Sequence, residues 1–514
     1  MKFNLKKSIL SLLICASVVS TAVIYGGNNN TADAESTRVT LSEKLKSVTK
    51  TPKYIFLFIG DGMSYPQFQS ASDYLGALEQ GNSPEILKGG KYLSFMNFPV
   101  AGSATTYDSS SFCPDSASTA TSISTGHKTY SGVINMNEAK TEKFETVAEK
   151  LKNQLGYEIG VVTSVNLNHA TPAAFYAHQP SRNNYYEIGR EMVESDFDYF
   201  AGGGLLDPEG KDGNSESIYT LAEKAGYTVA DTKAEAEKVN ANTDKAVIIG
   251  ETLADSDSLS YENDRTDSEW ALADYVKKGI EVLDNDKGFF MMVEGGKIDW
   301  ACHANDAGST VNDTIALSNA VDEAIKFYNE HPDETLILVT GDHETGGLTI
   351  GYAGTDYDTY LANLENQKIS YAKFDSDYVA KYKENKTPFE TVLKDIEANF
   401  GLVAKENAKE DTNEKLILTD YEYNKLKAAY DKTMSGEEVD KSNQEEYVLY
   451  GTYEPLSVTI THILNNKSGI NFASYSHTGL PVAVFAKGAG QSLFEGFYDN
   501  TDIYNNIAGL MGLK

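Results

Sequence analysis

The stretch Thr340-Gly-Asp-His-Glu-Thr-Gly-Gly347 decides the fold of this 514-residue chain. It follows the apolar run at residues 336–339, which predicts a buried strand. The chain therefore leaves a sheet and at once presents a carboxylate and an imidazole, Asp342 and His343. Open α/β sheets bind ligands beyond the carboxyl ends of their strands, so this segment predicts a functional site at such an end.

Two further predicted strands lead into side chains of the same kinds. The run at residues 54–59 ends in Gly60-Asp61-Gly62, and the run at residues 289–293 leads into two carboxylates and an imidazole. Those three side chains are Glu294, Asp299 and His303. Three strands that end in Asp, Glu and His predict one site for several metal ions.

Between residue 54 and about residue 350, strand-like apolar runs alternate with helical patterns. Further strands are predicted at residues 158–163, 246–249, 289–293 and 335–339, and helices at residues 144–155, 270–283 and 314–329. This alternation is typical of an α/β fold with a doubly wound, mainly parallel central sheet and helices on both faces. We therefore predict one large domain over residues 51–514.

The composition changes from about residue 352 to about residue 453. This stretch is rich in Tyr, Lys, Asn, Asp and Glu and has few runs typical of buried strands, so we predict a surface insertion with several helices. Strand-like patterns return at residues 457–460 and 481–485.

The overall composition excludes several classes of partner and of scaffold. With 44 basic and 75 acidic side chains the net charge is -31, which argues against nucleic acid and anionic membrane surfaces as partners. An anionic substrate would also need strong local positive charge, which metal ions can supply. Beyond the N-terminal segment only Cys113 and Cys302 remain, so we expect two free, buried thiols and no disulfide scaffold.

The N-terminus predicts a signal peptide over residues 1–34, followed by an N-terminal extension over residues 35–50. Three early lysines precede the largely apolar residues 9–25, and Ala32-Asp33-Ala34 fits the small-x-small cleavage pattern. The alternative is an uncleaved anchor, which the polar residues after the apolar run disfavour. We expect an exported protein, periplasmic, cell-surface or extracellular, without stable membrane insertion after cleavage.

The segment Cys113–Gly126 predicts a tight turn that leads into a helix of small residues. Ser116 would lie near the N-terminus of that helix, where unpaired N–H groups and the helix dipole favour an oxyanion. Taken alone, a serine in this position is most often an N-cap. Because it accompanies candidate metal ligands, we interpret Ser116 as a nucleophile whose pKa a base or a metal lowers.

Five segments in order resemble those of alkaline phosphatases, and the similarity extends from about residue 53 to about residue 510. The segments are Gly60-Asp61-Gly62, Pro114-Asp115-Ser116-Ala117, Glu294 to Asp299 with His303, Asp342-His343, and His477-Thr478-Gly479. His169, Trp300 and the long insertion resemble the marine Vibrio-type, cold-adapted subgroup, since the enterobacterial pattern has Asp and Lys at these two positions.

The resemblance implies two zinc ions and one magnesium ion per subunit. The first zinc would use Asp299, His303 and His477; the second Asp61, Asp342 and His343 with the Ser116 oxygen; and the magnesium Asp61, Thr171 and Glu294. Zinc accepts such nitrogen and oxygen ligands, and an all-oxygen set suits magnesium.

Three further residues take roles from the resemblance. Arg182 matches the family's phosphate-clamping arginine, whose planar fork holds two phosphate oxygens. His169 and Trp300 are expected beside the third metal ion. An imidazole there suits transition metals as well as magnesium, which leaves the identity of that ion open.

The resemblance implies a secreted alkaline phosphatase, a phosphoric monoester hydrolase that acts on small-molecule phosphate monoesters through a phosphoserine at Ser116. It also implies a homodimer, and the tyrosine-rich residues 352–453 have the aromatic content that interfaces favour. Two alternatives are a phosphodiesterase of the same superfamily and a secreted protein that binds metal or phosphate without catalysis. A phosphatase assay with an aryl phosphate distinguishes them.

Overall fold

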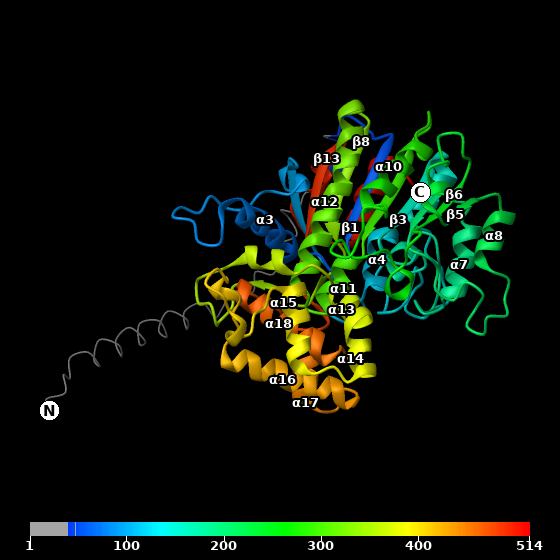
Figure 1. Ribbon diagram of the computed structural model, residues 1–514. Coiled ribbons are helices and arrows are strands. Elements are labelled where there is room, and N and C mark those ends of the chain that lie inside the picture. The colour runs from blue at the N-terminus through cyan, green and yellow to red at the C-terminus, as the bar shows by residue number, and fades with distance from the viewer. Residues whose placement is uncertain (1–39, 47) are drawn as a thin grey trace, which may run out of the picture. The chain divides into compact units, whose positions relative to one another are not determined.

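The computed structural model describes residues 40–46 and 48–514, and within them ten strands form one central sheet (Figure 1). Their order across the sheet is β14-β2-β13-β8-β1-β7-β3-β4-β6-β5. Their bounds are β1 Tyr54–Gly60, β2 Val100–Thr105, β3 Glu158–Thr163, β4 Tyr199–Gly202, β5 Thr228–Ala230, β6 Ala246–Ile249, β7 Phe289–Gly295, β8 Thr335–Gly341, β13 Val482–Gly488 and β14 Phe497–Asp499.

The sheet is mainly parallel, as predicted. Only β13 runs antiparallel to its neighbours, β2 and β8, among the strand pairs of the described sheet. Every residue of β1, β7 and β8 is buried, because helices cover both faces of the centre of the sheet.

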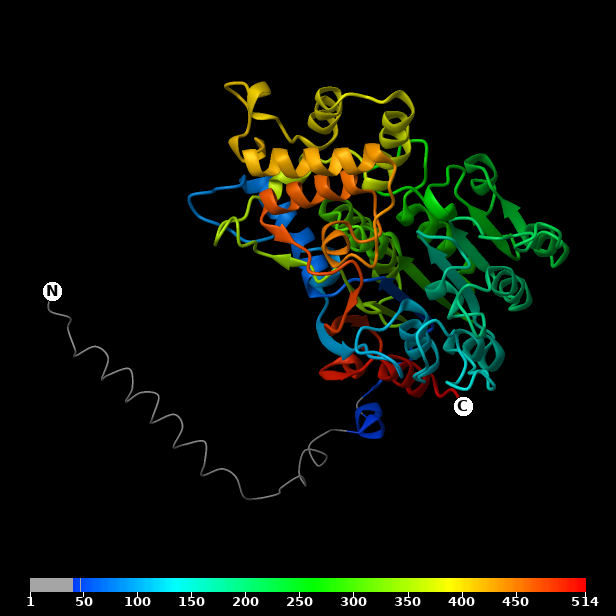
Figure 2. The ribbon, with the colours of Figure 1, turned by 90° about the horizontal axis from the view of Figure 1, so that it is seen from below.

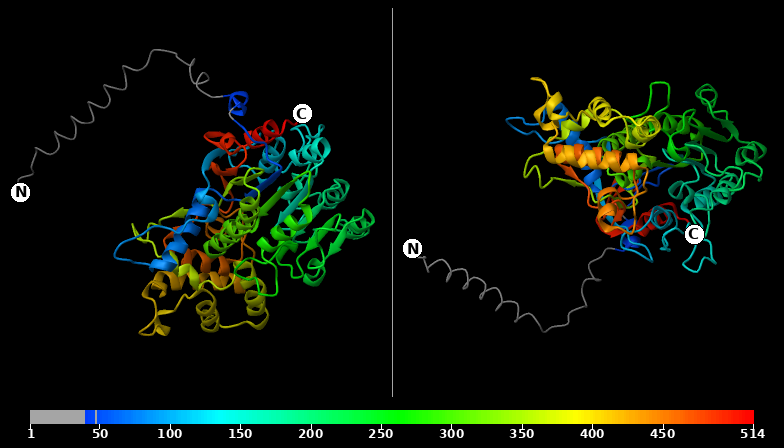
Figure 3. Two further views of the ribbon diagram at one scale, coloured as in Figure 1. Left: turned by 90° about the horizontal axis from the view of Figure 1, so that it is seen from above. Right: turned by 60° about the horizontal axis from the view of Figure 1, so that its bottom comes forward.

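Aromatic contacts show which elements cover each face. The ring of Phe56 in β1 meets Phe327 of α12 with ring centroids 5.7 Å apart. On β7, Phe290 is paired with Ile55 and so points to the opposite face, where it stacks on Phe175 at 6.1 Å. Helices α10 and α12 therefore lie on one face, and the segment around α6 lies on the other (Figure 3).

The helices of the α/β core are α3 Tyr65–Gln80, α4 Ser116–Thr125, α5 Val147–Lys150, α6 Ala170–Ala173, α7 Tyr185–Glu194, α8 Ile218–Lys224, α9 Lys233–Ala236, α10 Leu272–Leu283, α11 Lys297–His303, α12 Ala307–Glu330 and α19 Thr501–Met511. Helix α12 begins earlier than the pattern at 314–329 predicted. The side chain of Asp306 accepts the Ser309 N–H at 2.9 Å and caps the helix there.

Residues 352–453 contain the helices α13 Tyr371–Phe374, α14 Ala380–Asn385, α15 Phe389–Phe400, α16 Asp420–Ser435 and α17 Gln444–Tyr450. They gather beside the sheet and pack on α18 Pro455–Ser468, which runs along α16 (Figure 2). The strand predicted at residues 457–460 is wrong, because these residues lie inside α18. Pro455 begins that helix, and its buried packing against α16 overrides the strand propensity of the β-branched residues.

The short helix α2 (Leu41–Leu45) belongs to a separate N-terminal unit, residues 1–47, and is capped by Thr40 and Glu43. The expected signal peptide, residues 1–34, and residues 35–39 of the expected extension lie outside the described residues. Within residues 40–46 and 48–514, the helices are all too short or too polar to cross a membrane.

A close approach at the end of β8 gives the first testable prediction. A Cβ on Gly341 would lie 1.9 Å from the carbonyl oxygen of Met63, a contact that only a backbone shift can relieve. Gly341→Ala should lower the free energy of unfolding by about 1–3 kcal/mol and displace the adjoining Asp342. Denaturant unfolding measures the loss. As a control, a Cβ on Gly189 would meet only the flexible side chain of Ile218 at 3.1 Å, so Gly189→Ala should change stability little.

Candidate metal centre and active site

The candidate centre lies where the parallel strands β1, β7 and β8 end. The strands are in register, with their last residues opposite one another: Gly60, Gly295 and Gly341. Asp61 follows β1, Glu294 is the last residue but one of β7, and Asp342 follows β8. All three carboxylates are completely buried, so the sheet register brings acidic groups together away from water.

A first group of candidate ligands joins α11 to a later loop. Helix α11 carries Asp299 and His303 four residues apart on one face, and His477 comes from the short strand β12 (His477–Thr478), which pairs with β9 (Glu344–Thr345). The Nε2 atoms of His303 and His477 are 3.0 Å apart, and Asp299 Oδ2 lies 3.3 Å from His303 Nε2. The structure thus brings together the residues predicted for the first zinc.

Main-chain carbonyl groups orient both imidazoles of this group. His303 Nδ1 donates to the carbonyl oxygen of Tyr475 at 2.6 Å, and His477 Nδ1 donates to that of Pro114 at 2.5 Å. A carbonyl oxygen only accepts, so each Nδ1 carries a proton, and in the neutral ring each Nε2 keeps its lone pair. That lone pair faces the group, as metal ligation requires.

His343 lies at the middle of a second group. Its Nε2 is 3.1 Å from Ser116 Oγ and 3.3 Å from both Asp61 Oδ1 and Asp342 Oδ2. The ligand atoms of Asp61, His343 and Asp299 fall within 4.8 Å of one another, so Asp299 adjoins both groups. Asp342 Oδ1 accepts two main-chain N–H groups, which leaves Oδ2 as its atom facing His343.

Asp61, His169 and Glu294 form a third group. His169 Nδ1 and Glu294 Oε1 are buried without a hydrogen-bond partner and lie 4.0 Å apart. Thr171 Oγ1 donates to Asp61 Oδ2 at 3.2 Å. An unpaired buried carboxylate oxygen is unfavourable, and a cation beside Glu294 Oε1 would satisfy it. The two carboxylates of the group therefore fit a metal ion. His169 lies closer to a ligand position than the sequence predicted, but its Nε2 accepts the Arg182 N–H, so Nδ1 of the neutral ring carries the proton and would have to lose it to bind the ion.

Ser116 is the first residue of α4 and is buried beside the second group, with an exposed fraction of 1%. Asp115 caps the helix by accepting the Ser118 N–H at 3.1 Å. The small side chains that follow let α4 pack closely, so the helix N-terminus and the Ser116 hydroxyl meet the metal ligands. This arrangement suits a nucleophile that works next to an anion.

Arg182 binds Asp115, the residue before Ser116. Its Nη1 donates to Asp115 Oδ2 at 2.9 Å, and its Nη2 lies 3.0 Å from His169 Nε2. His169 in turn meets the ring of Trp300 edge-on, with centroids 5.8 Å apart. Asp115 and His169 thus hold the guanidinium of Arg182 in place at the edge of the centre.

Burial and mutual repulsion govern the ionisation of the carboxylates. Burial, followed by the charges of Asp342, Asp299 and Glu294, raises the pKa of Asp61 well above its usual range. Burial is also the main cause that raises the pKa of Asp342 and of Glu294 to about 7. Burial opposes ionisation of Asp299 as well, but the positive charge of protonated His303 holds the pKa of Asp299 well below its usual range. The centre is therefore short of positive charge.

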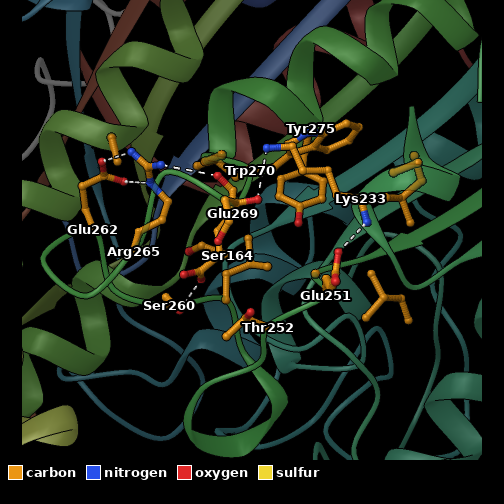
Figure 4. A pocket seen from close by; sticks show the side chains of 18 of the residues that line it. Ser164, Lys233, Glu251, Thr252, Ser260, Glu262, Arg265, Glu269, Trp270 and Tyr275 are labelled. Atoms are coloured by element: carbon orange, nitrogen blue, oxygen red, sulfur yellow. Dashed lines mark hydrogen bonds and ion pairs between the residues drawn. The ribbon is translucent and has the colours of Figure 1, made fainter. Parts of the chain in front are cut away.

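A separate cavity of about 110 Å³ lies beside the end of β6 (Figure 4). Its charged side chains already pair with one another: Arg265 binds Glu262, and Glu269 accepts the hydroxyl of Ser260. Its lining includes none of the candidate ligands described above. The chemistry thus belongs to the strand ends and not to this cavity.

The comparisons with known proteins agree with this geometry. The profile of the alkaline phosphatase family matches residues 52–513. The chain belongs to the alkaline phosphatase family. It is 30% identical to alkaline phosphatase 4 of Bacillus subtilis (strain 168) over 511 residues, which cover 98% of this chain and 96% of that protein. It is also 30% identical to alkaline phosphatase 3 of that organism, again over 98% and 96% of the two chains.

Solved structures confirm the predicted fold. The cold-active alkaline phosphatase of Shewanella sp. is 27% identical, with a TM-score of 0.71 over 89% of this chain and 99% of that one. The Thermus thermophilus alkaline phosphatase, 23% identical, has the same fold with a TM-score of 0.71 over 94% and 96% of the chains. The likeness to a cold-active enzyme agrees with the resemblance seen in the sequence.

Two supporting residues of the candidate centre, Thr345 and Thr163, were not predicted from the sequence. Thr345 Oγ1 donates to Asp299 Oδ1 at 2.5 Å and lies 3.2 Å from His343 Nδ1, so it links two groups. Thr163 donates to Glu294. Thr345 lies in the deciding segment two residues after His343, which was a usable signal, whereas nothing in the sequence singled out Thr163. Both cysteines are free; Cys302 is buried as expected, but Cys113 is exposed.

The pKa values predict proton release on metal binding. Asp342 and Glu294, with pKa about 7, are mostly protonated at pH 6 and ionised at pH 9 in the metal-free protein. Metal ions bind deprotonated ligands, so binding should release more protons at pH 6 than at pH 9. His343 and His477, with pKa about 4 because of burial, are neutral at both values and add none. Calorimetry in buffers of different ionisation enthalpy counts the protons, and equal release at both pH values would contradict the prediction.

Proposed function

We propose that this alkaline phosphatase hydrolyses phosphate monoesters through a phosphoserine at Ser116, with two zinc ions and one magnesium ion per subunit. The observation that carries the proposal is the position of Ser116 Oγ. It stands at the N-terminus of α4, 3.1 Å from His343 Nε2 and 3.4 Å from Asp61 Oδ1. A hydroxyl placed among candidate metal ligands and beside Arg182 supports nucleophilic phosphoryl transfer.

The two groups around Asp299 and His343 would hold the zinc ions. Bound there, zinc would supply positive charge to the oxygens that attack and leave phosphorus and would lower the pKa of water. The positive charge of the zinc ions would also lower the raised pKa values of the buried carboxylates, so that these groups ionise. Imidazole nitrogens and carboxylate oxygens in these groups support the choice of zinc.

The chain's own residues account for the two chemical steps. Ser116 Oγ attacks phosphorus as its hydroxyl proton passes to solvent, the ester P–O bond breaks, and the departing alkoxide takes up a proton from solvent to leave as the alcohol. Water then attacks the phosphoserine, the bond from phosphorus to Oγ breaks, and phosphate leaves as the serine hydroxyl is restored. The N–H groups at the start of α4 and the forked guanidinium of Arg182 stabilise the negative equatorial oxygens in both steps.

Asp61, Thr171 and Glu294 form the proposed magnesium site. Their oxygens suit magnesium. A transition metal would suit the site if His169 Nδ1 gave up its proton, and elemental analysis of the native protein distinguishes the two ions. The ion at this site would bind Asp61, which the second zinc ion also uses. This shared ligand supports a role for the third ion in holding the Asp61 carboxylate in place.

Replacing the nucleophile tests the proposed reaction. Ser116→Ala should abolish the phosphoserine and lower kcat by several orders of magnitude, because it removes the attacking atom but keeps the helix N-terminus. Acid quenching with radiolabelled aryl phosphate measures the intermediate. A variant that is still phosphorylated, or that keeps a near-parental rate, would refute the assignment. A parallel assay with an aryl phosphodiester tests the phosphodiesterase alternative, which predicts faster turnover of the diester.

We further propose that the protein is exported and acts as a homodimer. Export rests on the charge and apolar pattern of residues 1–34. The dimer rests on the family resemblance and on exposed apolar side chains in the insertion, among them Tyr421 and Val448, which are 74% and 66% exposed. Such side chains favour a self-complementary interface in which the insertion contacts the partner subunit.

Polar substitution on the insertion tests the dimer. Tyr421→Ser with Val448→Ser should raise the dimer dissociation constant at least tenfold, because apolar surface would no longer be buried between subunits. Analytical ultracentrifugation across a dilution series measures it. Tyr92→Ser is the matched control, since Tyr92 is 63% exposed outside the insertion. If the double variant stays as dimeric as the parent, these side chains lie outside any interface.

A further inference from the structure

The insertion and α18, the helix that follows it, contact the segments that carry the first group of ligands. We propose that residues 352–453, together with α18, hold His303 and His477 of the same chain in the geometry that binds the first zinc. Two contacts transmit this support, one through Tyr475 and one through Asn305. The inference rests on the proposed two-zinc function, and it gives the insertion a role inside its own subunit.

The first contact is Tyr475, which binds a candidate zinc ligand through its main chain and the insertion through its side chain. The main-chain carbonyl of Tyr475 accepts the Nδ1 proton of His303 at 2.6 Å, and His477 is only two residues further on. The hydroxyl of Tyr475 donates instead to the carbonyl of Leu449 in the insertion, at 2.8 Å. The backbone that fixes His303 is therefore anchored to the insertion through one side chain.

The end of the insertion is shaped to receive this tyrosine. Gly451 has φ of 61° and ψ of -119°, and a Cβ there would lie 2.7 Å from the Tyr475 ring, so only glycine permits the contact. The rings of Tyr453 and Tyr447 lie 6.1 and 6.3 Å from that of Tyr475. Both belong to the insertion, which thus encloses the ring with aromatic neighbours.

The second contact is an asparagine that joins the two ligand-bearing segments. Asn305 follows α11 with φ of 52°, and its Nδ2 donates to the carbonyl of Cys302 at 2.9 Å and to that of Ser474 at 2.8 Å. The first bond holds the end of α11, which carries His303. The second holds the loop that leads to His477. One amide group therefore sets the distance between the two imidazoles.

Helix α18 fixes this asparagine from the other side. His462 Nε2 lies 3.0 Å from Asn305 Oδ1, and Asn465 Nδ2 donates to the main-chain carbonyl of Asn305 at 2.7 Å. Since Oδ1 only accepts, Nε2 of His462 carries the proton. The insertion holds the start of α18 in turn, because the Leu456 N–H donates to Thr433 Oγ1 of α16 at 3.1 Å. A continuous set of hydrogen bonds thus connects the insertion to the first zinc ligands.

The second group has different supports. His343 and Asp342 follow β8, and Asp61 follows β1, so the sheet positions these ligands. The proposal therefore makes a selective prediction: loss of either contact weakens the first zinc site and leaves the second unchanged. General loosening of the fold would weaken both.

Two conservative variants of the full-length protein test the contacts. Tyr475→Phe keeps the ring but removes the hydroxyl that binds Leu449. Asn305→Gly removes the amide but tolerates the positive φ. Zinc titration of the metal-free protein against a chromogenic chelator, in saturating magnesium, resolves the two affinities. Each variant should bind one zinc ion about 10–100-fold more weakly than the parent and the other with unchanged affinity. Excess zinc should restore kcat in both.

Matched controls come from the same insertion. Tyr357→Phe removes a hydroxyl from a side chain that is 97% exposed, and Asp356→Gly replaces an exposed residue with φ of 55°. Both should bind both zinc ions like the parent. Unchanged zinc affinities in Tyr475→Phe and Asn305→Gly, or an equal loss at both sites, would overturn the proposal. A parent that binds two zinc ions but hydrolyses no phosphate monoester would refute the proposed function alone, because the affinities would still test the contacts.

Discussion

The register between β1 and its two parallel neighbours, β7 and β8, is the constraint on which the rest of the centre depends. It places Asp61, Glu294 and Asp342 at the same edge of the sheet, completely buried. Carboxylates so close together repel one another and lose hydration, which is why burial and neighbouring charge raise their pKa. Cations relieve both effects, so the arrangement of the sheet creates the demand for metal ions.

Hydrogen bonds from the surrounding residues orient the candidate metal ligands. Main-chain carbonyls take the Nδ1 protons of His303 and His477, so both rings present a lone pair. The N-terminus of α4 brings Ser116 to the same place, where the strand ends, the helix N-terminus and the imidazoles meet. The proposed nucleophile and a helix N-terminus suited to an anion thus share one location.

The peripheral helices extend the same logic outward. The α/β core sets Asp61, Glu294 and Asp342 at strand ends, but His477 lies in the two-residue strand β12 at the end of a loop far along the chain. A loop needs support that a sheet residue does not, because fewer neighbouring strands restrain it. Tyr475 and Asn305 supply hydrogen bonds to that loop, and the insertion and α18 hold them. Parts of the chain remote from the reaction therefore act on it through geometry.

The sequence by itself determined the α/β class and the strands at 54–59, 289–293 and 335–339, because long apolar runs are local properties. The i, i+4 spacing of Asp299 and His303 is local too, whereas His477 joined the first ligand group only through the family resemblance. It did not determine the helix at 455–468, since packing on α16 outweighs the strand propensity of residues 457–460. It placed His169 only near the third group. The unpaired Nδ1 facing Glu294 depends on contacts between residues 125 positions apart, and only the tertiary structure decides such contacts.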